Sequence, residues 1–100
     1  GELKSQQYRT DIGRIDILAK KKSDNSYVVI ELKRNQTSDD TVGQVTRYMG
    51  WVQEKFGDNN VCGVIVAGKY DEKLYYAQKM LKNIEVFLYE VNFKFNEYKK

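Results

Sequence analysis

The chain has 100 residues, 41% of them hydrophobic and 31% charged, which indicates a single globular domain with one core, residues 1–100. It has no histidine and one cysteine, so catalysis that needs histidine, histidine metal sites and an internal disulfide are excluded, and any metal needs oxygen ligands. The net charge of +3 is compatible with nucleic acid but is weak evidence for it, and with no signal peptide or apolar span we predict a cytoplasmic protein without a membrane partner.

The first half of the chain predicts three strands and a long helix. Strands are expected at residues 6–10, 14–20 and 27–33, where apolar residues alternate with polar ones or run together. A helix is expected to begin after "TSDD", with Ser38 as its N-cap, and to end near Phe56, before a glycine. The apolar stripe of this helix consists of Val42, Val45, Met49, Val52 and Phe56.

The second half predicts a strand, a helix and one or two closing strands. The run "NVCGVIVAG" is typical of a fully buried strand, in which Cys62 is a small buried side chain and not a reactive thiol. Residues 71–82 predict an amphipathic helix, and residues 84–91 and 92–98 predict half-buried strands. The order indicates an α/β fold with a mixed central sheet, in which antiparallel hairpins precede a helical crossover to a central strand.

The stretch "VVIELKRNQ" places two opposite charges on a strand that otherwise has core character. Glu31 and Lys33 are two residues apart, so they project from the same face. If the preceding turn is centred on Asp24 and Asn25, Asp16 faces Lys33 and lies diagonal to Glu31. Two carboxylates and a lysine can then converge at a strand end, as metal-dependent cleavage of a phosphodiester requires. A solvated surface ion pair is the alternative interpretation.

The segment "GRIDILAKKKSDNSYVVIELKRNQTSDDTVGQVTRYMGWV" resembles the PD-(D/E)xK nuclease superfamily and is most similar to the catalytic domain of its NucS/EndoMS type, with a RecB-like Gln-x-x-x-Tyr motif. The resemblance implies a restriction-endonuclease-like fold and an endonuclease that cleaves DNA with Mg²⁺ or Mn²⁺. The catalytic residues that it implies are Asp16, Glu31, Lys33, Gln44 and Tyr48, with Asp16, Glu31 and the backbone carbonyl of Leu32 as metal ligands.

The resemblance also assigns roles and exposes a difference. Lys33 would position the attacking water or stabilise charge, Gln44 would fix Lys33 or that water, and Tyr48 would contact phosphate or support the lysine. From spacing alone, Gln44 and Tyr48 share a helical face that borders the apolar stripe, so a packed helix flank is the alternative. Ile15 stands where the superfamily has proline. The helix that precedes the first strand in the family is not present, so we expect a fragment of a larger chain and an apolar gap beside the sheet.

Basic and small residues suggest where DNA would bind. A basic rim for phosphates would comprise Arg14, Lys20, Lys21, Lys22, Lys33, Arg34 and Arg47, with Arg14, Arg34 and Arg47 as the predicted nucleic-acid contacts. The lysine run is equally typical of a solvated turn, and Trp51 is expected to pack instead of stacking on a base. Gly43 and Gly50, inside the long helix, would permit close approach of DNA or a partner chain, or are simply tolerated on an exposed face.

The predicted function is therefore a metal-dependent DNA endonuclease whose partners are DNA, further domains of the same protein and, for a double-strand cut, a second copy in a two-fold homodimer. Two alternatives remain open. The first is a catalytically inactive nuclease-fold module for DNA binding or protein interaction. The second is a structural or dimerisation domain, which predicts that Asp16 and Glu31 point apart or pair with basic residues.

Overall fold

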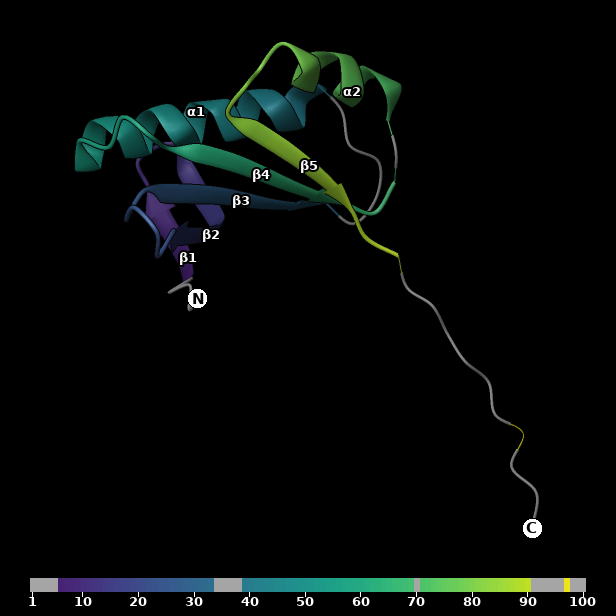
Figure 1. Cartoon of the computed structure of the whole chain (residues 1–100), viewed down its shortest axis with the longest axis horizontal. Coiled ribbons are helices and arrows are strands. Elements are labelled where there is room, and N and C mark those ends of the chain that lie inside the picture. Colours follow the sequence, from purple (N-terminus) through teal and green to yellow (C-terminus); the bar gives the residue numbers. More distant parts are fainter. Residues whose placement is uncertain (1–5, 34–38, 70, 91–96, 98–100) are drawn as a thin grey trace.

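The computed structural model describes residues 6–33, 39–69, 71–90 and 97 (Figure 1). The elements are β1 (Gln6–Thr10), β2 (Gly13–Lys20), β3 (Tyr27–Lys33), α1 (Asp39–Phe56), β4 (Cys62–Ala67), α2 (Glu72–Lys79) and β5 (Ile84–Leu88). Their order is the predicted one. The predicted N-cap Ser38 and, apart from Glu97, the last predicted strand lie outside the described residues.

The five strands form one mixed sheet in the order β1-β2-β3-β4-β5. The pairs β1–β2 and β2–β3 are antiparallel, whereas β3–β4 and β4–β5 are parallel and are connected through α1 and α2. Both helices lie on the same side of the sheet (Figure 1). The predicted mixed α/β architecture is confirmed. No helix among the described residues is both long and apolar enough to cross a membrane.

Helix α1 packs directly on the backbone of β4. Val45 and Val52 of its apolar stripe are fully buried. A Cβ atom added at Gly63 of β4 would lie 2.7 Å from Val45 Cγ1 and 2.8 Å from Met49 Sδ, so only glycine allows this approach. The helix ends where predicted, because Gly57 takes a left-handed conformation with φ 65°.

The turn between β2 and β3 is centred one residue earlier than predicted. Asp24 Oδ1 accepts hydrogen bonds from the Ser26 N–H (3.0 Å) and hydroxyl (2.7 Å), and Asn25 has a φ of 62°. Leu18 therefore pairs with Val29, not with Glu31. Because both strands shift by one residue together, each side chain keeps its predicted face.

The sheet face turned away from the two helices is apolar, and no helix of the described residues covers it (Figure 1). The strand register places on this face the side chains of Ile17, Ile30, Leu32, Val64, Val66 and Phe87. Leu32 is 47% exposed and Phe87 is 52% exposed. The prediction that β4 is fully buried is therefore wrong: alternate residues of β4, Cys62 included, are only half-buried. This face exposes apolar side chains, and the predicted gap left by a further helix stays a prediction.

Candidate active site

The part of β2 that contains Asp16 forms a β-bulge. Between the pairs Gln6–Leu18 and Tyr8–Ile15, β1 advances by two residues and β2 by three. Ile15 and Leu18 are consequently both buried although they are three residues apart. The extra residue falls in the stretch that contains Asp16. A bulge interrupts the regular alternation of side chains, and this one allows Ile15 to join Leu18 in the core next to Asp16.

Asp16 is held against the strand that carries Glu31. The last ladder pair of β2 and β3 is Ile17–Ile30. Beyond it, the Leu32 N–H donates a hydrogen bond to Asp16 Oδ2 at 3.0 Å, so a side chain takes the place of the next backbone partner. If this register is continued, Asp16 lies opposite Glu31. The predicted pairing of Asp16 with Lys33 is therefore wrong.

Glu31 is a buried carboxyl group with one unsatisfied oxygen. Glu31 is 3% exposed, and its Oε1 lies 3.6 Å from Lys33 Nζ. Its Oε2 is buried and has no hydrogen-bond partner in the described part of the chain. Burial and the neighbouring Asp16 carboxyl raise the pKa of Glu31 to about 7, although Lys33 acts in the opposite direction. The Asp16 carboxyl group is therefore near enough to act on Glu31, which favours an acid pair over two acids that point apart. Glu31 also pairs with Lys33, as the alternative of a structural domain predicts.

Helix α1 contributes a polar contact to the lysine. Lys33 Nζ lies 3.5 Å from Gln44 Oε1, at the outer limit of a hydrogen bond. The Lys33 side chain is 32% exposed, so one side of its ammonium group is open to solvent. Asp16, Glu31, Lys33 and Gln44 therefore gather at one end of the β2–β3 hairpin, on the face that α1 covers.

Tyr48 lies deeper than its predicted place on the helix flank. It is 5% exposed and belongs to the hydrophobic core. Its hydroxyl group lies against Gly13, exactly where a side chain at that position would project, and Gly13 has a φ of 138° that suits glycine alone. The prediction that Tyr48 only borders the apolar stripe of the helix was wrong for this reason. Gly13, which the sequence marked only as part of a turn, is the residue that admits the tyrosine.

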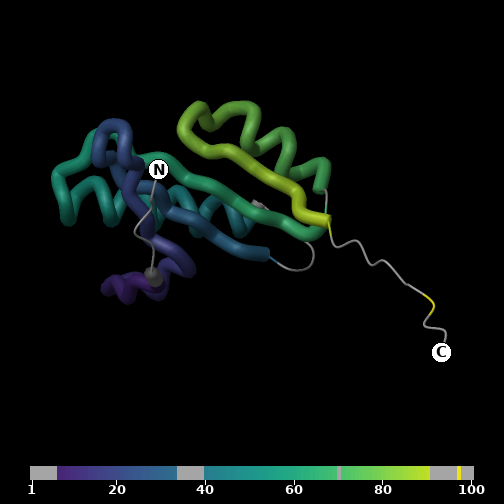
Figure 2. Tube along the Cα trace, turned by 60° about the horizontal axis from the view of Figure 1, so that its bottom comes forward, coloured from purple at the N-terminus to yellow at the C-terminus, as the bar shows by residue number. Residues whose placement is uncertain are grey.

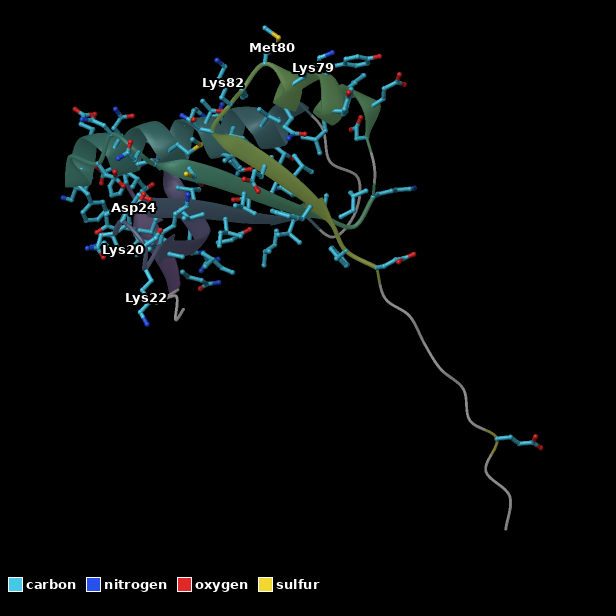
Figure 3. The ribbon with its side chains drawn as sticks, viewed as in Figure 1. Lys20, Lys22, Asp24, Lys79, Met80 and Lys82 are labelled. Carbon is cyan, nitrogen blue, oxygen red and sulfur yellow. The ribbon has the colours of Figure 1, made fainter. Side chains whose placement is uncertain are left out.

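The residues of the predicted basic rim are spread over β2, the β2–β3 turn and α1. Arg14 and Arg47 are exposed, while Arg34 lies outside the described residues. Lys20 and Lys22 lie at the β2–β3 turn with Asp24 (Figure 3), and four residues of strand, about 13 Å, separate Lys20 from Asp16.

The glycines of α1 and Trp51 have local explanations. A Cβ at Gly43 would lie 3.3 Å from Arg47 Nη1, so Gly43 leaves room for that arginine of its own helix. Nothing lies within 4 Å of a Cβ at Gly50, in keeping with tolerance on an exposed face. The packing role of Trp51 is confirmed, since its ring centroid lies 5.9 Å from that of Tyr8.

The chain matches known proteins over nearly its whole length. Residues 2–98 match the family described as Endonuclease NucS C-terminal domain. Endonuclease NucS of Methanocaldococcus jannaschii is 35% identical over 78 residues, which are 78% of this chain and 28% of that protein. Endonuclease NucS of Sulfolobus acidocaldarius is 36% identical over 81 residues, which are 81% of this chain and 30% of that protein.

Two solved structures share the fold. A repair endonuclease from Pyrococcus abyssi has a TM-score of 0.73 at 29% identity, over 90% of this chain and 39% of that one. EndoMS in an EndoMS–dsDNA complex has a TM-score of 0.67 at 23% identity, over 90% of this chain and 38% of that one. The chain thus spans less than a third of the curated relatives and about two fifths of the solved ones. It belongs to the Endonuclease NucS C-terminal domain family.

Proposed function

We propose that this chain is the catalytic part of a DNA endonuclease of the PD-(D/E)xK type, with the restriction-endonuclease-like fold, and that it hydrolyses phosphodiester bonds with Mg²⁺ or Mn²⁺. The observation that carries the proposal is the buried, unsatisfied Oε2 of Glu31 beside the Asp16 carboxyl group. A buried carboxylate without a partner is costly, and a bound cation is one of the few groups that would compensate it.

The donor set fits a hard cation. Asp16 and Glu31 offer carboxylate oxygens, and the Leu32 carbonyl would add a third oxygen. The described residues contain no cluster of three or more acidic or cysteine side chains, so water and a phosphate oxygen would complete the coordination. Mg²⁺ normally keeps several waters and uses one or two carboxylates, in agreement with this set. When bound, the cation would lower the pKa of a coordinated water and neutralise developing negative charge.

Lys33 and Gln44 have roles that follow from their contacts. The Lys33 ammonium group lies between Glu31 Oε1 and Gln44 Oε1, at 3.6 and 3.5 Å. Its open side can donate a hydrogen bond to the attacking water or to a phosphate oxygen that gains charge. Gln44 limits the rotamers of Lys33, and Tyr48, buried in the core, supports the site through the start of β2.

The relatives support the choice of substrate and partners. The EndoMS structure is a complex with dsDNA, so we propose DNA as the substrate of this chain. Arg14 and Arg47, exposed on β2 and α1, and Arg34 are the proposed contacts to its phosphates. The curated relatives extend well beyond the matched part, and we propose further domains of the same protein, and a second copy for a double-strand cut, as partners.

The test compares metal binding with cleavage in the complete protein. Asp16→Ala should weaken Mn²⁺ binding measured by calorimetry, because it removes a ligand charge. Lys33→Ala should leave most of that binding intact. Both variants should lose plasmid nicking, whereas the control Lys22→Ala, on the β2–β3 turn, should nick at the wild-type rate (Figure 3). Wild-type nicking by Lys33→Ala would refute the proposed role of the lysine. Absence of nicking by the wild-type protein, with DNA binding retained, would favour the inactive module.

A further inference from the structure

We propose that the β1–β2 hairpin binds a phosphate group of the DNA backbone between two arginines, Arg9 and Arg14. This inference rests on the proposed function and extends it, because it adds Arg9 and makes the hairpin a DNA-binding element. The two residues are Cα partners across the antiparallel pair, so their side chains project from the same face, and both are exposed.

The arginine pair has no internal explanation. Like charges directly opposite each other on neighbouring strands are unfavourable. Within the described part of the chain, neither guanidinium group has a hydrogen-bond or ion-pair partner, and the ion pair found there joins Lys33 to Glu31. Asp11 is in the adjoining turn but pairs with neither. Two adjacent, unpaired guanidinium groups form a suitable receptor for an anion with several oxygens, since each can donate two parallel hydrogen bonds.

The hairpin that carries the pair is fixed in conformation. The Thr10 hydroxyl donates a hydrogen bond to the Gly13 carbonyl at 2.7 Å and accepts one from the Ile12 N–H at 3.1 Å. Gly13 in turn lies against the buried Tyr48 hydroxyl. The backbone from which both arginines extend is therefore held in place before a ligand arrives, and this lowers the entropy lost on binding.

The pair lies near the candidate active site along β2, but on the opposite face of the sheet. Arg14 precedes Asp16 by two residues, or about 7 Å along the strand. Tyr8 and Ile15, the neighbouring pair, pack toward α1, so Arg9 and Arg14 project to the other side of the hairpin. The sheet order places this hairpin at the edge opposite β5, and Figure 2 shows its purple strands standing out from the rest of the chain. The arginine pair would therefore hold a phosphate at the edge of the sheet, on the face opposite to the acids, and not the phosphate that is cleaved.

The proposed ligand is the phosphodiester backbone, which is the same in every sequence. A contact of this kind fixes the position of the DNA without reading its bases. It should contribute to affinity in a manner that depends on salt, because each neutralised phosphate releases condensed counterions. Arg9→Gln/Arg14→Gln should therefore weaken binding to unrelated sequences equally and make binding less sensitive to salt.

The experiment measures binding without turnover. Fluorescence anisotropy of the complete protein with labelled duplex DNA, in EDTA, gives the dissociation constant over a range of salt concentrations. We expect the log–log salt slope of Arg9→Gln/Arg14→Gln to be smaller by about 1 than that of the wild type, as for one lost phosphate contact. Arg9→Lys/Arg14→Lys should keep most of the slope but bind more weakly, because lysine lacks the two-pronged geometry.

The control is Lys22→Gln/Lys79→Gln, which removes one positive charge from the β2–β3 turn, beyond the end of β2 that is far from Arg14, and one from the end of α2. It should keep the wild-type slope. Thermal melting of the glutamine variant should be no lower than that of the wild type, because a like-charge contact is removed, so a loss of binding would not reflect unfolding. Equal slopes for the wild type, the arginine variant and the control would overturn the proposal. DNA binding by the arginine pair in a protein that does not nick would leave this inference standing while the proposed nuclease function fails.

Discussion

The ionisation of Glu31 makes a quantitative prediction about stability. In the folded chain its pKa is raised from 4.5 to about 7. Between these values the folded state holds a proton that the unfolded state releases, so the free energy of unfolding falls as the pH rises from about 4.5 to 7. Each pKa unit corresponds to about 1.36 kcal/mol. The ionised carboxylate therefore costs the metal-free folded state up to about 3 kcal/mol at pH 8, and Glu31→Gln should recover most of it.

The assay is urea unfolding in EDTA at pH 4.5 and pH 8, followed by the fluorescence of Trp51. Glu31→Gln should have a free energy of unfolding higher than that of the wild type by up to about 3 kcal/mol at pH 8, and nearly equal to it at pH 4.5. The control Glu85→Gln, at an exposed position of β5, should change the stability by less than about 0.5 kcal/mol at either pH. A wild type at least as stable as Glu31→Gln at pH 8 would refute the reasoning.

Three further predictions concern packing, a side-chain contact and the acid pair. Gly63→Ala should lower the free energy of unfolding by about 1–3 kcal/mol, because α1 lies on that glycine. Gly50→Ala, with open space around the added Cβ, should raise the free energy of unfolding by up to about 1 kcal/mol. Urea unfolding measures both changes. Asp58→Ala should cost about 1–3 kcal/mol in the same assay, because Asp58 Oδ2 accepts the backbone N–H at the start of β3 at 2.7 Å, and Asp58→Asn should cost less. Asp16→Asn should lower the pKa of Glu31 in an NMR titration of its carboxyl carbon; an unchanged pKa would mean that burial alone causes the shift.

Sequence patterns within single segments were sufficient to predict the helices and strands and to select the residues of the candidate site. The apolar stripe of α1 and its glycine stop set both the extent of the helix and the face it buries. The face shared by Glu31 and Lys33 follows from strand alternation and survived a turn that was misplaced by one residue, because such a shift moves both strands together.

The remaining features depend on contacts between distant segments. The bulge at Asp16 appears only when β1 pairs with β2, and the sequence pattern of β2 looks like regular alternation. Tyr48 borders the stripe on a helical wheel, and its burial depends on Gly13, which leaves space for the hydroxyl group. The half-exposed face of β4 was also not predictable from its composition, because an apolar run does not reveal whether one or two layers cover it.

The change from antiparallel to parallel pairing at β3 has a consequence for the order of folding. β1, β2 and β3 are joined by short turns, whereas pairing of β3 with β4 must wait for a loop to close across the whole of α1. Local contacts form early and distant ones late. Asp16 and Glu31 should therefore meet while both are still hydrated, and Glu31 should lose its water only when α1 docks. The cost of burying the ionised Glu31 carboxylate then arises after the folding transition state. In chevron measurements, a change of pH should therefore alter the unfolding rate far more than the folding rate.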